Sequence, residues 1–497
     1  MLAELGLTED DWSQTPLAAR TALTLLWQQN RMLQSRCAAY EAQVERLQVQ
    51  VTELEKLRLE VAALRQRLGR NSGNSSQPPS SDPPYQRRAR RQEASGRKRG
   101  GQPGHPGHGR RLVPVEKVDQ VVELRPVSCR QCGSLLLGDD PRPLRRQICE
   151  LPPAQTYLTE YRAHALTCLH CGELNTAAWP ADSPAGSFGP RAQAVVAYLT
   201  GRLNLSQRDV TEALEVLHGL PLSLGSVAAV QKQVSAALAQ PVETAQRFVA
   251  GQPHHHLDET GWFEQHRLQW LWVDATSQVT AFHLSPGRGK KQAQAILGSK
   301  FAGAVTTDRY NAYHWLPDER RQLCWAHLKR DFQAFAERAG QSAEIGQALL
   351  AEVKELFTHW YELRAEECDW PDFEQAVRPI QARVKQLLEQ GTACDQVRTA
   401  GTCRQILKRE AALWTFTRVE GLEPTNNTAE RSLRRAVLWR RKSFGTQSAA
   451  GSQFVARILT AVTTLRQQGR DVLAWLTAAC SAAAGSPTPC CLLPDTS

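Results

Sequence analysis

The sequence predicts a multidomain α/β protein, and three observations lead to that prediction. The chain has 497 residues, and a chain of this length usually folds into about three domains. Apolar residues recur every seven positions over residues 20–69, which is typical of a coiled coil. Short strand-like runs fill much of residues 254–330, whereas residues 188–248 and 331–420 carry apolar side chains at helical spacing.

Residues 20–69 are expected to form one long helix that associates with another copy of itself. One seam of the repeat is apolar throughout: Leu26, Leu33, Tyr40, Leu47, Leu54, Val61 and Leu68. The other seam position is mixed: Leu23, Asn30, Cys37, Val44, Val51, Arg58 and Arg65. Polar residues on a seam can set the register and the number of helices. The alternative is a single amphipathic helix docked on its own chain, but the repeat is longer than an ordinary helix of about 8–20 residues.

A positively charged segment follows this helix. Residues 71–84 are polar, rich in proline and free of aromatic residues, so they are expected to be an unpacked linker. Residues 70–111 hold ten Lys or Arg and two acidic residues, which gives 10 − 2 = +8 of the chain's net charge of +10. Such a segment attracts a polyanion, and Arg97, Lys98 and Arg99 could lie in a DNA minor groove. The alternative is a solvated linker without a partner.

The sequence carries no membrane or export signal. It has no run of about 18 apolar residues, so no transmembrane helix and no membrane partner are expected. Its N-terminus lacks a basic region followed by an apolar core, so no signal peptide is expected. Together with the basic segment, these features predict a cytoplasmic, nucleoid-associated protein.

Two Cys-x-x-Cys pairs lie within residues 112–180. Cys129 and Cys132 form the first pair, Cys168 and Cys171 form the second, and a glycine follows each pair. Two-residue spacing lets both sulfurs of a tight turn face one ion, and two such turns make a tetrahedral thiolate site for structural Zn²⁺. The alternative is a redox pair, which would need only one Cys-x-x-Cys beside a βαβ unit.

Three acidic residues stand in settings that suit a second metal site. Asp258 and Asp308 each lie at the end of a strand-like run, and Glu430 lies in the first turns of a helix expected near Asn427. From Asp258 to Asp308 the predicted order is strand, strand, strand, helix, strand, with the helix near residues 290–297. That order can place the two aspartates on adjacent strands of a mixed sheet, where they could share a pair of divalent ions with Glu430.

Such a pair of ions is what attack on a phosphodiester requires. Two Mg²⁺ ions about 3.5–4 Å apart stabilise both the attacking and the leaving oxygen, and Mg²⁺ prefers carboxylate and water oxygens. Mn²⁺ could replace Mg²⁺. Each acid also has a simpler interpretation, because the aspartates could end strands at turns and Glu430 could complete a capping box with Asn427 as N-cap. The joint setting of the three acids favours the metal site.

The helix that holds Glu430 is strongly basic. Six positive charges fall within twelve residues: Arg431, Arg434, Arg435, Arg440, Arg441 and Lys442. Beside a metal site, such a helix suits a phosphate backbone, and all of these except Arg440 are candidate DNA-binding residues. A solvated basic face is the alternative.

These motifs resemble those of transposases of the bacterial insertion-sequence-66 family, a branch of the DDE recombinases with an RNase H-like catalytic core. The resemblance covers nearly the whole chain, and the matching segments occur in the family's order. They are residues 71–82 (NSGNSSQPPSSD), 100–108 (GGQPGHPGH), the two Cys pairs, 257–262 (LDETGW), 307–313 (TDRYNAY), 324–332 (CWAHLKRDF), 424–434 (PTNNTAERSLR) and 441–445 (RKSFG). Arg309 is a departure, because the family more often has glycine there.

The resemblance implies a function. A transposase of this family would bind the terminal inverted repeats of its element, hydrolyse the phosphodiester there, and join the freed 3′-hydroxyl to target DNA. Asp258, Asp308 and Glu430 would be its catalytic, metal-binding triad. Cys324 and His327 match a Cys/His signature found after the second acid in several DDE groups, and two roles are open for them: ligands of a metal site, or local packing of the core. The coiled coil would pair two protomers, and accessory proteins encoded by the element would be further partners.

The domain organisation expected from motifs and resemblance has eight parts. They are a coiled-coil helix (1–69), a basic linker (70–111), a zinc-binding ribbon (112–180), a helical DNA-binding region (181–250), the first part of an RNase H-like core (251–330), an α-helical insertion (331–415), the second part of the core with the glutamate helix (416–470) and a C-terminal tail (471–497). Two other functions remain open: an RNase H-like nuclease that stops at hydrolysis, and a catalytically inactive zinc-containing DNA-binding regulator.

Overall fold

The computed structural model divides the chain into two compact units, Met1–Arg88 and Ala89–Ser497. The residues it describes are 1–68, 75–77, 112–180, 186–486 and 490–494. Most of the predicted basic linker, including Arg97, Lys98 and Arg99, lies outside the described residues. None of the described helices is both long and apolar enough to cross a membrane.

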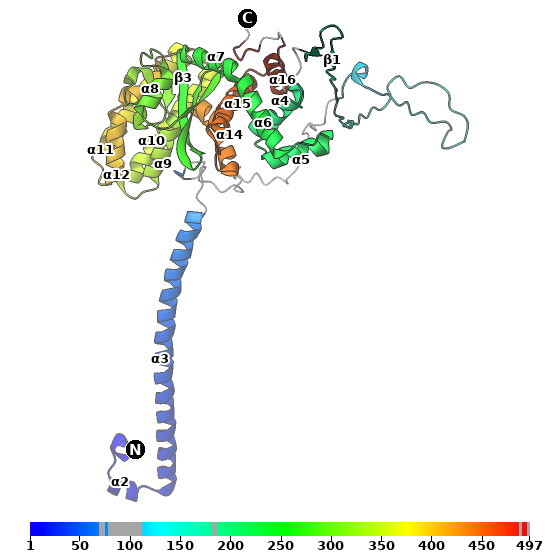
Figure 1. The fold of residues 1–497 in the computed structure, drawn as a ribbon. Helices are drawn as coiled ribbons and strands as arrows, with labels where there is room; N and C mark the ends of the chain where they lie inside the picture. Colours follow the sequence, from blue (N-terminus) through cyan, green and yellow to red (C-terminus); the bar gives the residue numbers. More distant parts are fainter. Residues whose placement is uncertain (69–74, 78–111, 181–185, 487–489, 495–497) are drawn as a thin grey trace. The chain divides into compact units, whose positions relative to one another are not determined.

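The first unit is dominated by one long helix. α1 (Leu2–Leu5) and α2 (Glu9–Gln14) precede α3 (Leu17–Leu68), which runs without a break in Figure 1. The single long helix predicted for residues 20–69 is thereby confirmed. Its apolar seam remains in water, since Leu26, Leu33, Tyr40, Leu47 and Leu54 are each between 50% and 61% exposed. A coiled-coil partner would cover a seam of this kind.

The second unit is built round a five-stranded mixed sheet with the strand order β5-β4-β3-β6-β7. The strands are β3 (His254–Glu264), β4 (Arg267–Ala275), β5 (Thr280–Ser285), β6 (Ala304–Thr307) and β7 (Arg321–Leu323). β3, β4 and β5 are antiparallel neighbours, whereas β6 pairs parallel with both β3 and β7. α8 (Lys290–Leu297) connects β5 to β6, so the predicted order of strands and helix is confirmed.

Helices make up most of the remaining chain. Before the sheet come α4 (Pro190–Gly201), α5 (Gln207–His218), α6 (Leu224–Ala237) and α7 (Ala239–Ala250). After β7 come α9 (Trp325–Ala336), α10 (Gln341–Arg364), α11 (Trp370–Thr392), α12 (Val397–Leu407), α13 (Glu410–Leu413), α14 (Asn427–Ser443), α15 (Ala449–Gln467) and α16 (Val472–Ala483). Single 3₁₀ turns lie at Val115–Lys117, Asn311–Tyr313, Asp318–Arg320 and Thr415–Thr417. The two predicted helical regions, on either side of the sheet in sequence, are therefore confirmed.

Helices cover both faces of the sheet (Figure 1). On one face, Leu257 and Trp272 pack against α8 in a common apolar cluster. On the other face, Trp262 and Val273 pack against α14 and α15. Alternation along β3 therefore directs odd-numbered residues near Leu257 to the α8 face and even-numbered residues to the α14 face.

α16 is an addition to the prediction, which placed the last helix near Gly451 and left residues 471–497 as a tail. It packs against α4, and Trp475 and Leu476 join the helical core. The Asp471 carboxylate caps it by accepting from two backbone N–H groups. The sequence of α16 is almost wholly apolar or small, so it lacks the alternation of apolar and polar faces from which a helix is predicted. A helix that is apolar all round is typically buried in a core.

The turn after α14 approaches the end of β3 closely. Gly445 has φ +104°, and a Cβ at this position would collide with the carbonyl oxygen of Phe263. Gly445→Ala is therefore expected to lower the free energy of unfolding by about 1–3 kcal/mol, measured by chemical denaturation. Gly401→Ala is the control, because Gly401 lies inside α12 with open space round it and alanine there should add about 0.5–1 kcal/mol. Similar losses in both variants would contradict this reading of the turn.

Candidate active site

The sheet brings Asp258 and Asp308 to equivalent places on adjacent strands. β3 and β6 run parallel, and His256 pairs with Thr306. Asp258 lies two residues after His256, inside β3, and Asp308 lies two residues after Thr306, directly after β6. The Oδ1 atom of Asp258 accepts a hydrogen bond from Glu259 N at 2.9 Å, and that of Asp308 accepts one from Tyr310 N at 2.9 Å. The predicted neighbourhood of the two aspartates is confirmed.

The next residue in the chain, Glu259, faces the opposite side of the sheet. Its carboxylate is buried, accepts a hydrogen bond from Arg288 Nε at 2.6 Å and another from the Tyr313 hydroxyl. Arg288 also lies over the ring of Tyr310, 3.9 Å from its centroid. Glu259 is therefore held by its own partners, and of the two adjacent acids it is Asp258 that faces α14.

α14 supplies Glu430 to the same face. Asn426 precedes this helix and is fully buried; its Nδ2 donates to Leu257 O at 2.9 Å, and its backbone N donates to Cys324 Sγ at 3.1 Å. These bonds fix the start of α14 beside the residue that precedes Asp258. The alternative capping box is wrong, because Asn426 and not Asn427 is the N-cap and no side-chain cap bond forms.

The three predicted acids act on one another electrostatically. Burial and the negative charges of Glu259, Asp308 and Glu430 raise the pKa of Asp258 well above its ordinary range. Burial raises the pKa of Glu430; Arg330 opposes this shift and Asp308 adds to it. The Oε1 atom of Glu430 is buried without a hydrogen-bond partner among the described residues. Such a group of carboxylates favours a bound cation, which would remove the mutual repulsion.

The Cys/His signature lies against Glu430. Ligand atoms of Cys324, His327 and Glu430 all fall within 4.8 Å of one another, and His327 Nδ1 is 3.4 Å from Glu430 Oε1. Burial, and then the charge of Arg330, lower the pKa of His327 to about 4, so its ring is neutral at pH 7. Burial raises the pKa of Cys324 to about 11, so it is a protonated thiol that packs α9 against the start of α14.

Arginine side chains fix the segment that follows β6. Arg309, the expected departure from the family's motif, forms an ion pair of 2.8 Å with Asp331 on α9. Arg321 is fully buried on β7, and its guanidinium donates to Thr307 Oγ1 at 3.0 Å and to Asp308 O at 2.7 Å. Burial lowers the pKa of Arg321 to about 10, so it remains charged at neutral pH. Neither contact could be found in the sequence, because both cross between elements.

The basic residues of α14 fall into different surroundings. Arg431, Arg434, Arg441 and Lys442 are exposed, and Lys442 Nζ reaches Asn204 O at 3.5 Å. Arg435 is half-buried and, with Arg431, lines a cavity. Arg440, the sixth charge of the predicted basic run, instead donates to Thr260 Oγ1 at 3.1 Å and to Gly261 O, so it ties α14 to β3.

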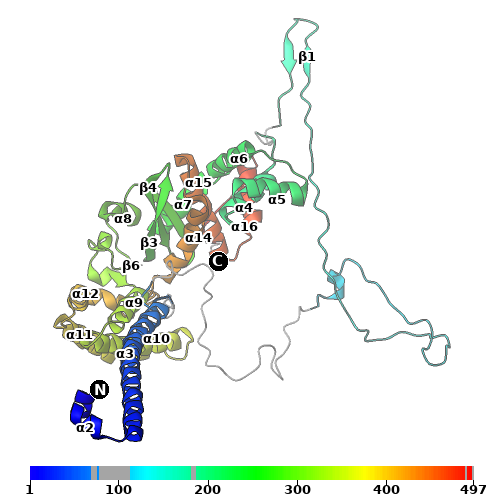
Figure 2. The same cartoon turned by 90° about the horizontal axis from the view of Figure 1, so that it is seen from below.

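Each Cys-x-x-Cys pair forms the same tight turn. Gly133 N donates to Cys129 O at 2.9 Å, and Gly172 N donates to Cys168 O at 2.8 Å. Both glycines have φ near +75°, as the turn requires. The second turn joins the hairpin of β1 (Ala165–Thr167) and β2 (Leu174–Thr176), with β1 labelled in Figure 2.

The structure does not bring the two Cys pairs together. Among the described residues, the only group of three or more close metal-ligating side chains is Cys324, His327 and Glu430. Hydrogen bonds from Ser134, and then from Cys129, lower the pKa of Cys132 to about 7, so a substantial fraction of this thiol is ionised at neutral pH. The zinc site therefore stays a prediction.

Comparison with known proteins places this site in a family. Residues 185–454, more than half of the chain, match the Transposase IS66 family, and residues 19–111 match DUF6444, a family of unknown function. Two uncharacterized proteins of Sinorhizobium fredii are similar: y4qI is 27% identical over 230 residues, and y4jD is 24% identical over 223 residues. These matches cover 42% and 41% of this chain and 42% of each relative, less than half of their length. The match that includes Asp258, Asp308 and Glu430 shows that the chain belongs to the IS66 transposase family.

Proposed function

We propose that this chain is a DNA transposase that cuts and joins DNA with two Mg²⁺ ions held by Asp258, Asp308 and Glu430. The observation that carries the proposal is the electrostatic coupling of three carboxylates supplied by β3, the end of β6 and α14: Asp308 and Glu430 raise the pKa of Asp258, and Asp308 raises that of Glu430. The strand order, with two antiparallel strands on one side of β3 and two parallel strands on the other, supports an RNase H-like core. The helices between β7 and α14 would be the insertion in that core.

The donor set fits divalent cations. All three proposed ligands are carboxylates, which suit Mg²⁺ or Mn²⁺, and the Oε1 atom of Glu430, which accepts no hydrogen bond among the described residues, would serve as one ligand atom. When bound, the ions would activate the attacking oxygen and stabilise the leaving one. Asp258 and Asp308 would hold them from the sheet, and Glu430 from α14. Arg321 would keep the Asp308 backbone in place, and neutral His327 would position Glu430.

DNA would approach along α14. Arg434 and Arg441 are exposed on the helix that carries Glu430, and their charges suit backbone phosphates of a DNA strand beside the site. The helices α4 to α7 and the basic segment 70–111 would add further contacts to the terminal inverted repeats and to target DNA. These DNA contacts are proposed because the chain belongs to a transposase family. The proposal includes no membrane partner.

A site-specific cutting assay tests the proposal. Full-length protein and Mg²⁺ would be incubated with a labelled duplex that ends in the terminal repeat of its element, and the products resolved on a sequencing gel. The expected product is a nick at the repeat end with a free 3′-hydroxyl. Cutting spread over unrelated sequence would instead favour the simple RNase H-like nuclease.

The Cys pairs are proposed to hold one structural Zn²⁺. Cys129, Cys132, Cys168 and Cys171 offer four thiol ligands in two like turns, and the lowered pKa of Cys132 favours the thiolate that zinc requires. Metal analysis of the purified chain is expected to find about one zinc per chain, and Cys132→Ser to lose most of it. Cys37→Ser, at an exposed position of α3, is the control that keeps its zinc. Equal zinc content in both variants would contradict the site.

α3 is proposed to hold two protomers together as a coiled coil. Leu47 lies on the exposed seam, whereas Val49, two residues further, lies off it and is 67% exposed. Leu47→Glu should weaken self-association by about 100-fold or more, because each of two protomers loses an apolar side chain worth about 1.5–3 kcal/mol when buried. Light scattering at several concentrations would measure this, with Val49→Glu as the control that leaves the oligomer intact. A monomeric parent would contradict the coiled coil.

A further inference from the structure

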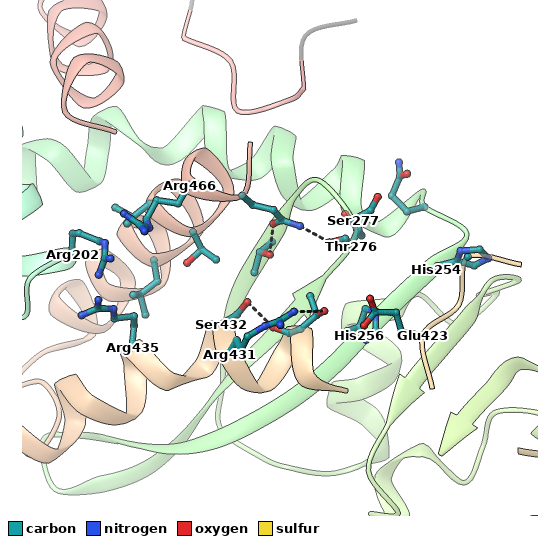
Figure 3. Close-up of a pocket in the computed structure, with 18 of the residues that line it drawn as sticks. Arg202, His254, His256, Thr276, Ser277, Glu423, Arg431, Ser432, Arg435 and Arg466 are labelled. Carbon is teal, nitrogen blue, oxygen red and sulfur yellow. Dashed lines mark hydrogen bonds between the residues drawn. The ribbon is translucent and has the colours of Figure 1, made fainter. Parts of the chain in front are cut away.

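A cavity of about 760 Å³ lies on the α14 face of the sheet, apart from the three acids. Figure 3 shows its lining, which comes from the end of α4, the start of β3, the loop after β4, α14 and the end of α15. Its size is within the ~300–1,000 Å³ usual for sites that hold small ligands. Arg202 at the C-cap of α4, Arg435 on α14 and Arg466 on α15 gather at one end (Figure 3).

α14 separates this cavity from Glu430. Thr428, Arg431, Ser432 and Arg435 all line the cavity and are spaced three, four and seven residues from the first, so they form one stripe of the helix. Arg435 lies about 140° round the axis from Glu430, at 3.6 residues per turn. Glu430 contacts α9 on the opposite flank. The cavity is therefore a distinct site.

The arginine end of the cavity has an uncompensated positive charge. Among the described residues, no ion pair forms to Arg202, Arg435 or Arg466, and Nε and Nη1 of Arg202 are buried without a hydrogen-bond partner. The acidic residue of the lining, Glu423, is engaged by Arg364 at 3.1 Å. Burying an arginine beside two like charges costs stability, and an anion that accepts hydrogen bonds from all three would remove that cost.

The opposite end of the cavity offers neutral polar groups. His256 is more than nine-tenths buried, lines the cavity and has an Nδ1 atom without a partner among the described residues. Thr276 and Gln467 also line the cavity and are bonded to each other, since Gln467 Nε2 donates to Thr276 O at 2.6 Å. A ligand with an anionic head and a neutral, hydrogen-bonding body matches this lining.

We propose that the cavity binds the phosphate group of a nucleotide through Arg202, Arg435 and Arg466, with the sugar and base toward His256. The nucleotide is either the 5′-terminal residue of a DNA strand or a free one, since both present the same chemistry. This site does not depend on the proposed catalytic metals, so its test is run in EDTA.

Calorimetric titration of the full-length chain with deoxyadenosine 5′-monophosphate tests the site. The parent is expected to bind it, and not to bind deoxyadenosine, which lacks the phosphate. Arg202→Met and Arg466→Met should each weaken binding by about 10- to 100-fold, because a hydrogen bond to a charged group contributes about 1.5–3 kcal/mol. Arg398→Met, which removes one charge from an exposed position on α12, is the matched control and should bind like the parent.

Thermal unfolding without ligand separates this role from a structural one. Arg202→Met should unfold at the same or a higher temperature than the parent, because it removes a half-buried charge whose Nε and Nη1 atoms lack hydrogen-bond partners among the described residues; a structural arginine would give a lower temperature. A second titration compares a 5′-phosphorylated oligonucleotide with its 5′-hydroxyl form. A gain from the phosphate that Arg202→Met abolishes assigns the strand end as ligand, and no gain assigns the free nucleotide. Failure of the parent to bind the monophosphate at millimolar concentration, or binding by both arginine variants as tight as by the parent, overturns the proposal.

Discussion

Asp258→Asn is expected to lower the rate of DNA cutting by about a thousandfold or more while the protein still binds DNA. The substitution removes a negatively charged metal ligand, and bound metals supply several kcal/mol of transition-state stabilisation, with a factor of ten in rate for each ~1.4 kcal/mol. Single-turnover cutting of element-end DNA would measure the loss. Asp119→Asn, at an exposed position far from the acids in sequence, is the control that should cut like the parent.

The same variant should change the pH dependence of stability. Because the pKa of Asp258 is raised in the folded protein, its stabilising contribution is fully present below the ordinary aspartate pKa of about 3.9 and is lost as pH rises through the raised value. In EDTA, Asp258→Asn should therefore be more stable than the parent at neutral pH. Addition of Mg²⁺ should stabilise the parent more than it stabilises the variant. A less stable variant would mean that no repulsion exists among the acids.

Arg321→Ala is expected to lower the free energy of unfolding by about 3–5 kcal/mol. It empties a fully buried position and removes the donors that hold Thr307 Oγ1, Asp308 O and Tyr310 O, and both losses are costly in a core. Cutting should also fall, because the backbone of Asp308 loses its support. Arg321→Lys should recover little of the stability lost in Arg321→Ala, since lysine lacks the planar fork of donors of the guanidinium group.

Denaturant unfolding would measure this effect, with the neighbouring Arg320→Ala as control. Arg320 is exposed and donates one bond, of 3.3 Å, to Phe301 O, so its loss should remain within about 0.5 kcal/mol. A loss for Arg321→Ala as small as that of the control would contradict the role given to this buried arginine.

The sequence predicted those features that repeat or follow from local order. The spacing of Leu26 to Leu68 predicted the long helix, and the order of strands between Asp258 and Asp308 predicted that these acids would be neighbours. Because side chains alternate along a strand, Asp258 and Glu259 face opposite sides of the sheet. The motif alone does not show which of the two acids faces α14. In each case the signal lies within one element or in the order of adjacent elements.

The remaining features depend on contacts between distant segments. Asn426 bonds to Leu257 across 169 residues, and Arg202 and Arg435 meet from helices that no sequence period relates. Arg440 belongs to the basic run but is not among the candidate DNA-binding residues, and composition could not show that its side chain joins α14 to β3. The two Cys pairs are a further example. Their spacing predicts the tight turn that each pair forms, but it cannot show whether the two turns come close enough to share one ion.

The joining of element-end DNA to a target plasmid is the most direct measurement of the central claim. Purified full-length protein would be given a labelled, pre-nicked element end, a supercoiled target and Mg²⁺, beside the Asp258→Asn variant. The proposed transposase predicts a covalently joined product for the parent and none for the variant. If the parent binds the element end but joins nothing in Mg²⁺ or Mn²⁺, or if the variant joins as well as the parent, then strand transfer by Asp258, Asp308 and Glu430 is contradicted.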